Sequence, residues 1–132
     1  MNVLMSPKTI FTVVGILILV HGAMFFFGAG HMATTGVPNI SDEALNVGKG
    51  AHEIVAFFNI FLAAVLLFSR NIDLESAKKV LTGVGIGCVV MVVGIAYHMQ
   101  SMIIEHAPPL PVLIVFLLLS IWSFYVALLK KD

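Results

Sequence analysis

Charge is scarce in this sequence, and no stretch is rich in charge of one sign. Of 132 residues, 11% are charged, and seven Lys or Arg residues balance seven Asp or Glu residues. Soluble domains carry about 25% charged residues, whereas 60% of this chain is apolar. These proportions exclude an ordinary soluble domain and predict an integral membrane protein. The lack of a basic run also excludes nucleic acid as a partner, because such binding neutralises many phosphates.

Cysteine is nearly absent as well. Cys88 is the only cysteine of the chain, so the chain can form neither an intrachain disulfide nor a CxxC redox or zinc site. Because Cys88 lies in the middle of a long apolar segment, we interpret it as a packing residue.

Four long apolar segments take up most of the chain. They cover about residues 9–30, 47–68, 80–104 and 110–129, and each is long enough to cross about 30 Å of hydrocarbon as a helix. Within lipid a single segment has to satisfy its backbone hydrogen bonds internally, which selects the α-helix. The sequence therefore predicts an all-α protein, an integral membrane four-helix bundle that forms one domain over residues 1–132.

A polar cluster precedes the second apolar segment. Ser41 is followed by Asp42 and Glu43, an order typical of a helix N-terminus, because a serine oxygen accepts a hydrogen bond from a free backbone N–H there. We predict that these residues cap a short surface helix ahead of the second segment.

The positive charges indicate which way the segments run. Cytoplasmic loops of membrane proteins carry an excess of Lys and Arg. One assignment of the segments places six of the seven such residues on the same side and leaves only Lys49 on the other. The six are Lys8, Arg70, Lys78, Lys79, Lys130 and Lys131. We therefore predict a multi-pass protein of the cytoplasmic membrane with both termini in the cytoplasm.

Glycines recur at spacings that place them on one helix face. Gly83 and Gly87 are four residues apart, while Gly15 and Gly22, and Gly87 and Gly94, are seven apart. Small residues on one face let neighbouring helix backbones approach closely. We predict that these glycines pack helices of the same chain together, with a dimer interface as the alternative.

Four ionisable residues lie inside the segments, toward their outer ends. His21 belongs to the first segment, His52 and Glu53 to the second, and His98 to the third. Counting the helical rise from the segment ends puts them within about 5 Å of a common depth. Ionisable side chains inside a membrane are costly and are functional candidates for that reason. We predict that these four residues form a ligand-binding site in the outer half of the bundle.

A structural role is the alternative at two of these positions. A neutral His21 could be buried as a packing residue if both ring nitrogens find partners. Glu53 lies four residues after Lys49, and such a pair could simply anchor the helix at the membrane surface.

Three cofactors or ligands suit such a site. Imidazole and thioether donors suit copper, and the candidate metal ligands are His21, His52, His98, Met102 and His106. Two facing histidines, such as His21 with His52 or His98, are a standard way of holding haem b. A quinone needs only one or two polar groups in an apolar pocket. The histidine spacing matches no dedicated metal motif, so the sequence favours none of the three strongly.

The layout of the chain has four helices in 132 residues, with Gly48-Lys49-Gly50 at the start of the second and Glu105-His106-Ala107-Pro108-Pro109 before the fourth. In this layout the chain resembles small bacterial DoxX-like membrane proteins, although some of those carry an arginine where this chain has His52-Glu53. The resemblance implies a subunit of a membrane oxidoreductase or a protein without assigned activity, and it transfers no site residue.

These observations predict a small, non-enzymatic accessory or binding subunit of the membrane. It would work in the lipid bilayer within a larger membrane complex or a homo-oligomer. A redox or metal protein that binds haem b or copper through the same histidines is the alternative. A transporter or channel is the second alternative, but the inner halves of the segments hold few polar residues for a continuous path.

Overall fold

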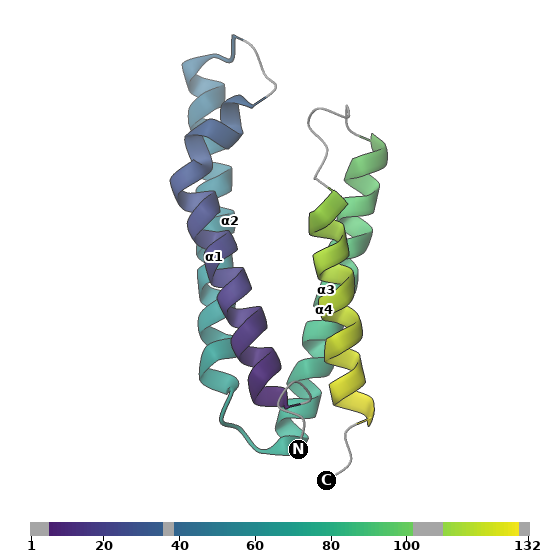
Figure 1. Ribbon diagram of the computed structural model, residues 1–132. Coiled ribbons are helices and arrows are strands. Elements are labelled where there is room, and N and C mark those ends of the chain that lie inside the picture. Colours follow the sequence, from purple (N-terminus) through teal and green to yellow (C-terminus); the bar gives the residue numbers. More distant parts are fainter. Residues whose placement is uncertain (1–5, 36–38, 102–109, 130–132) are drawn as a thin grey trace. The chain divides into compact units, whose positions relative to one another are not determined.

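The computed structural model describes residues 6–35, 39–101 and 110–129, and every regular element in these ranges is a helix. The helices are α1 over Pro7–Thr34, α2 over Asp42–Ser69, α3 over Leu74–Ser101 and α4 over Leu110–Leu129 (Figure 1). All four are long and apolar enough to cross a membrane. The prediction of an all-α chain with four helices of spanning length is confirmed.

α2 begins before the apolar segment that predicted it. Its first residue is Asp42 rather than Val47, and the Ser41 hydroxyl accepts a hydrogen bond from the Ala44 N–H at 3.2 Å. Ser41 therefore caps α2 itself, and the prediction of a separate surface helix is wrong. Hydropathy misses the first turns of α2 because a capped polar turn can be helical without being apolar.

The chain folds into two compact units. One comprises residues 12–68, which hold most of α1 and nearly all of α2. The other comprises residues 1–11 and 69–132, which hold the start of α1 together with α3 and α4. In the first unit α1 and α2 lie side by side, and in the second α3 and α4 do so (Figure 1). Each unit is built on a helical hairpin.

Small residues let α1 and α2 approach each other closely. A Cβ atom added at Gly22 would lie 3.0 Å from the Asn59 Cβ atom and 3.1 Å from the Ala56 carbonyl oxygen. A Cβ atom added at Gly15 would lie 2.8 Å from the Cγ atom of Leu67. Gly15, the earlier glycine of α1, meets Leu67 near the end of α2, whereas the later Gly22 meets Asn59. The two helices are therefore antiparallel. The predicted packing role of Gly15 and Gly22 is confirmed.

α3 and α4 pack through a glycine other than the predicted ones. A Cβ atom added at Gly85 would lie 2.9 Å from the Phe124 ring, and the Ser120 hydroxyl donates a hydrogen bond to the Gly85 carbonyl at 3.2 Å. No described atom lies within 4 Å of a Cβ atom added at the predicted glycines Gly83, Gly87 and Gly94. Gly83 and Gly87 lie two positions from Gly85 and so do not share the helix face that meets α4. That Gly83, Gly87 and Gly94 pack helices of this chain together stays a prediction.

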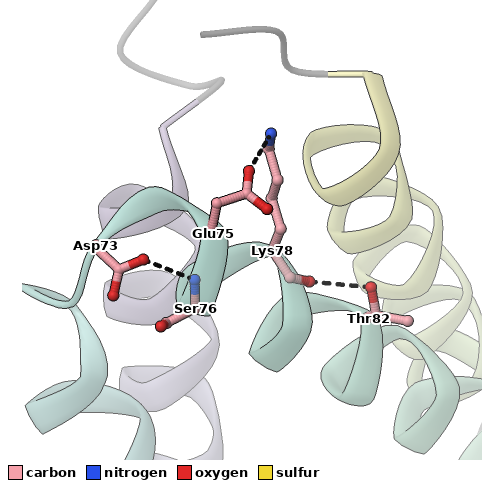
Figure 2. A network of polar contacts seen from close by, with 5 residues as sticks. All are labelled: Asp73, Glu75, Ser76, Lys78 and Thr82. Carbon is pink, nitrogen blue, oxygen red and sulfur yellow. Dashed lines mark hydrogen bonds and ion pairs between the residues drawn. The ribbon is translucent and has the colours of Figure 1, made fainter.

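α3 also begins before its apolar segment, and a polar network forms its first turns (Figure 2). The Asp73 carboxylate accepts a hydrogen bond from the Ser76 N–H at 2.9 Å. Lys78 donates to the Glu75 carboxylate at 3.0 Å, and the Thr82 hydroxyl donates to the Lys78 carbonyl at 2.9 Å. The Asp73 carboxylate thereby satisfies one of the backbone N–H groups that have no partner within the helix at its start.

Acid should weaken this cap. The Ser76 N–H, which donates to Asp73, lowers the pKa of the Asp73 carboxyl from its ordinary value of 3.8. A carboxyl whose pKa is lower in the folded state stabilises the fold above its unfolded pKa, and this stabilisation is lost as the pH falls through the folded pKa. Asparagine also caps helices but does not titrate. We expect Asp73→Asn to lose less stability than the wild type between about pH 5 and pH 2, measured by thermal unfolding in non-ionic detergent.

The control for this measurement is Glu75→Gln, which removes the neighbouring carboxylate but leaves the cap intact. It should follow the wild type over the same pH range more closely than Asp73→Asn does. If the wild type and Asp73→Asn lose stability in parallel, the Asp73 cap does not contribute to the acid sensitivity of the fold.

Two serines of α4 are buried and differ in their hydrogen bonding. Ser120 is bonded to Gly85, whereas the hydroxyl of Ser123, a residue that is 0% exposed, has no partner among the described residues. A buried hydroxyl without a partner costs about 1–3 kcal/mol. We therefore expect Ser123→Ala to stabilise the fold by about 1 kcal/mol and Ser120→Ala to destabilise it by a similar amount. Unfolding by SDS in mixed micelles would measure both, and a loss of stability in Ser123→Ala would contradict the expectation.

Candidate functional site

A hydrogen bond joins the two helices of the first hairpin at a histidine. The Asn59 side-chain Nδ2 atom lies 3.1 Å from the His21 Nδ1 atom. His21 precedes Gly22, one of the points where α1 closely approaches α2, and Asn59 lies three residues after Ala56 on α2. We call the close contact of α1 with α2 at Gly15 and Gly22 the close seam. It sets the distance at which His21 and Asn59 meet.

The bond to Asn59 decides where the proton of His21 lies. An amide nitrogen can only donate, so Nδ1 accepts and the neutral ring carries its proton on Nε2. Among the described residues of its own unit, 12–35 and 39–68, Nε2 has no hydrogen-bond partner. One nitrogen of this half-buried ring is thus held by α2, and the other has no partner within the hairpin.

His52 is held in a similar way by its own helix. Its Nδ1 atom lies 2.8 Å from the Gly48 carbonyl oxygen, four residues earlier. A carbonyl can only accept, so Nδ1 carries the proton and Nε2 of the neutral ring has a free lone pair. Within the described part of the first unit, no donor reaches that lone pair.

Phe25 links the two histidines. Its ring centroid lies 4.5 Å from that of His21 and 5.6 Å from that of His52. We call His52, Phe25, His21 and Asn59 the polar row; all four are half-buried. Asn59 was not among the predicted site residues, although it lies seven residues after His52 and so shares a face of α2 with it.

The two histidines of the row lie at different levels along the hairpin. Asn59, which bonds His21, is seven residues from His52, or about 10 Å along the axis of α2. This separation is about twice the spread that the sequence predicts. Two axial ligands must bond the same iron, and the Phe25 ring contacts both imidazoles. In this arrangement His21 and His52 are not a pair of ligands for one haem.

The described residues also contain no group of three or more His, Cys, Asp or Glu side chains that could hold a metal ion. Two of the predicted metal ligands, Met102 and His106, lie outside the described residues. A copper site built on these residues stays a prediction.

Glu53 is not joined to the polar row. Its carboxylate lies 3.7 Å from the Lys49 Nζ atom, four residues earlier on α2, and both side chains are partly exposed. Exposed pairs of this kind contribute about 0–1 kcal/mol. The geometry agrees with the alternative interpretation, in which Lys49 and Glu53 anchor the helix.

His98 lies on α3, in the other unit of the chain. Its ring packs against that of the preceding residue, Tyr97, with 5.5 Å between the ring centroids. Both residues are exposed. That His98 joins His21 and His52 in one site stays a prediction.

Comparison of the chain with known protein families, with curated proteins and with solved structures found no match. The resemblance to DoxX-like proteins therefore rests on the layout of the helices alone. The polar row, which bridges the two helices of the first hairpin, is the basis of the function proposed below.

Proposed function

We propose that the protein is a small, non-enzymatic accessory or binding subunit of the cytoplasmic membrane, and that the polar row is its binding site. Its four helices cross the membrane with both termini in the cytoplasm, and the row lies in the outer half. The observation that carries this proposal is the pair of imidazoles whose Nδ1 atoms are held by Asn59 and Gly48 while their Nε2 atoms have no partner among the described residues of the first hairpin.

An open nitrogen at each ring favours binding over a purely structural role. A histidine that only packs between helices has to satisfy both nitrogens, because an unpaired polar group in an apolar medium is costly. Here α2 supplies one partner to each ring, and the half-buried row leaves the second nitrogen within reach of another molecule. A ligand or a partner helix with suitable polar groups would complete the set.

The remainder of the hairpin favours a site over a transport path. The stretch of α2 from Ile60 to Phe68 contains only apolar residues, as does the stretch of α1 from Val13 to Val20. The polar row therefore does not continue toward the cytoplasmic ends of these helices in the proposed topology. A channel or a proton relay needs polar groups or water along its whole length.

The test is photocrosslinking inside the native membrane. A benzophenone amino acid in place of Phe25, within the row, should give one adduct of defined mass when the membrane is irradiated and the protein is weighed intact. The control is the same amino acid in place of Phe27, whose side chain is 86% exposed and should give a mixture of lipid adducts. Replacing His21 or His52 by phenylalanine should remove the defined adduct at position 25.

The same mixture of lipid adducts at both positions would show that the row is merely exposed to bulk lipid. That result would overturn the proposed binding site.

A further inference from the structure

The hydrogen bond between His52 and Gly48 restricts what can bind beside His52. Its Nδ1–H is used by the Gly48 carbonyl at 2.8 Å, so the Nε2 atom of the neutral ring can only accept. A molecule that completes the hydrogen bonding of His52 must therefore bring an O–H or N–H group. A ligand that offers only acceptors, such as an ether or an ester, would leave this nitrogen unsatisfied.

The charges near His52 cancel. Lys49 and Glu53 flank it in sequence and pair with each other at 3.7 Å. An anionic headgroup would have to compete with Glu53 for Lys49, and a cationic one would have to compete with Lys49 for Glu53. The surroundings of His52 therefore favour a donor without net charge.

The level of His52 along α2 suits the head of an amphiphile. α2 has 28 residues, about 42 Å at the helical rise, so it exceeds the roughly 30 Å hydrocarbon layer. His52 comes ten residues after the start of α2, or about 15 Å along it. In the proposed topology His52 lies within about 10 Å of the outer border of the hydrocarbon layer. Past Glu53, the apolar residues 54–58 separate it from Asn59 nearer the centre.

We infer that the polar row binds a neutral amphiphile with a hydroxyl head, and that this hydroxyl donates its hydrogen bond to His52 Nε2. The inference rests on the proposed function. The ring of Phe25, 5.6 Å from His52, packs against the part of the ligand next to the hydroxyl. The apolar tail runs along the hairpin toward the centre of the membrane. A phenolic lipid and a diacylglycerol both carry this chemistry.

The inference can be tested with three probes added to the protein in lipid nanodiscs. These are 4-nonylphenol, its methyl ether 4-nonylanisole, and dioleoylglycerol. The protein carries ¹⁵N-labelled histidine, so that NMR reports directly on the Nε2 atom of His52. We expect a hydroxyl probe to shift the Nε2 resonance of His52 and to bind at least about fivefold more tightly than the ether. Whichever hydroxyl probe does so identifies the source, phenolic or aliphatic.

Matched variants separate a hydrogen bond from simple partitioning into lipid. His52→Phe keeps an aromatic ring beside Phe25 but removes the acceptor, and should abolish the preference for the hydroxyl probe. His31→Phe changes an exposed histidine near the end of α1 that lies outside the row, and should keep the preference. The inference would be overturned if 4-nonylphenol and 4-nonylanisole bound the wild type equally and dioleoylglycerol bound no more tightly than 4-nonylanisole.

The photocrosslinking test distinguishes the two proposals. A defined adduct at position 25 without any preference for a hydroxyl probe would leave the binding site standing and remove this ligand class. If position 25 gives no defined adduct and no probe is preferred, both proposals are wrong.

Discussion

Replacing Gly22 by alanine is expected to destabilise the first hairpin by about 1–3 kcal/mol. The added Cβ atom would lie 3.1 Å from the Ala56 carbonyl oxygen, a backbone atom that cannot turn away, and 3.0 Å from the Asn59 Cβ atom. The helices would have to separate there. Because Asn59 also holds His21, the same separation should lengthen or break the hydrogen bond between α1 and α2.

Gly30→Ala is the matched control for this change. No described atom lies within 4 Å of a Cβ atom added at Gly30, and alanine is favoured over glycine within a helix by about 1 kcal/mol. The control should therefore be neutral or slightly stabilising. SDS-induced unfolding in mixed micelles would give both stabilities, and the ¹⁵N signals of His21 would report on its hydrogen bond. Equal effects of Gly22→Ala and Gly30→Ala would contradict the close seam.

Replacing Asn59 by leucine is expected to destabilise the protein by about 1–3 kcal/mol. Leucine fills a similar volume but leaves His21 Nδ1 without its donor at a half-buried position between α1 and α2. The loss of stability should come mainly from the missing hydrogen bond, because leucine adds apolar surface that can pack between the helices. Asn71→Leu, at an exposed position after α2, is the control and should change stability little.

A double-mutant cycle separates the hydrogen bond from other effects of these changes. His21→Phe removes the group that Asn59→Leu leaves unpaired, so the double variant should be more stable than the sum of the single losses. We expect a coupling of about 0.5–1.5 kcal/mol, the range of polar contacts between membrane helices. Additive losses would mean that the contact between His21 and Asn59 contributes no stability.

The four helices could be predicted because their apolar stretches are long enough to require them. Their first turns could not be predicted in the same way. The early turns of α2 and α3 are polar, and the bonds that stabilise them come from Ser41 and Asp73. Capping residues were visible before α2, but only the structure shows that the capped turn continues directly into the apolar helix.

The candidate site was harder to predict because it depends on how α1 and α2 align. The periodicity of a sequence shows which residues share a helix face, but not which residue of a neighbouring helix stands opposite. Gly22 meets Ala56 and Asn59, and this alignment brings Asn59 rather than His52 to His21. Both histidines were predicted as site residues, whereas the asparagine that holds one of them was not.

The packing of small residues between α1 and α2 does not by itself fix how the two helices align along their axes. Small residues repeat every seven positions, as Gly15 and Gly22 on α1 and as Ala56 and Ala63 on α2. Sliding one helix past the other by two turns would again bring one glycine of α1 opposite one of these alanines of α2. That slide would part His21 from Asn59 by about 10 Å. The directional contact between His21 and Asn59 thus favours the observed alignment in addition to the steric fit, as polar residues do in coiled coils.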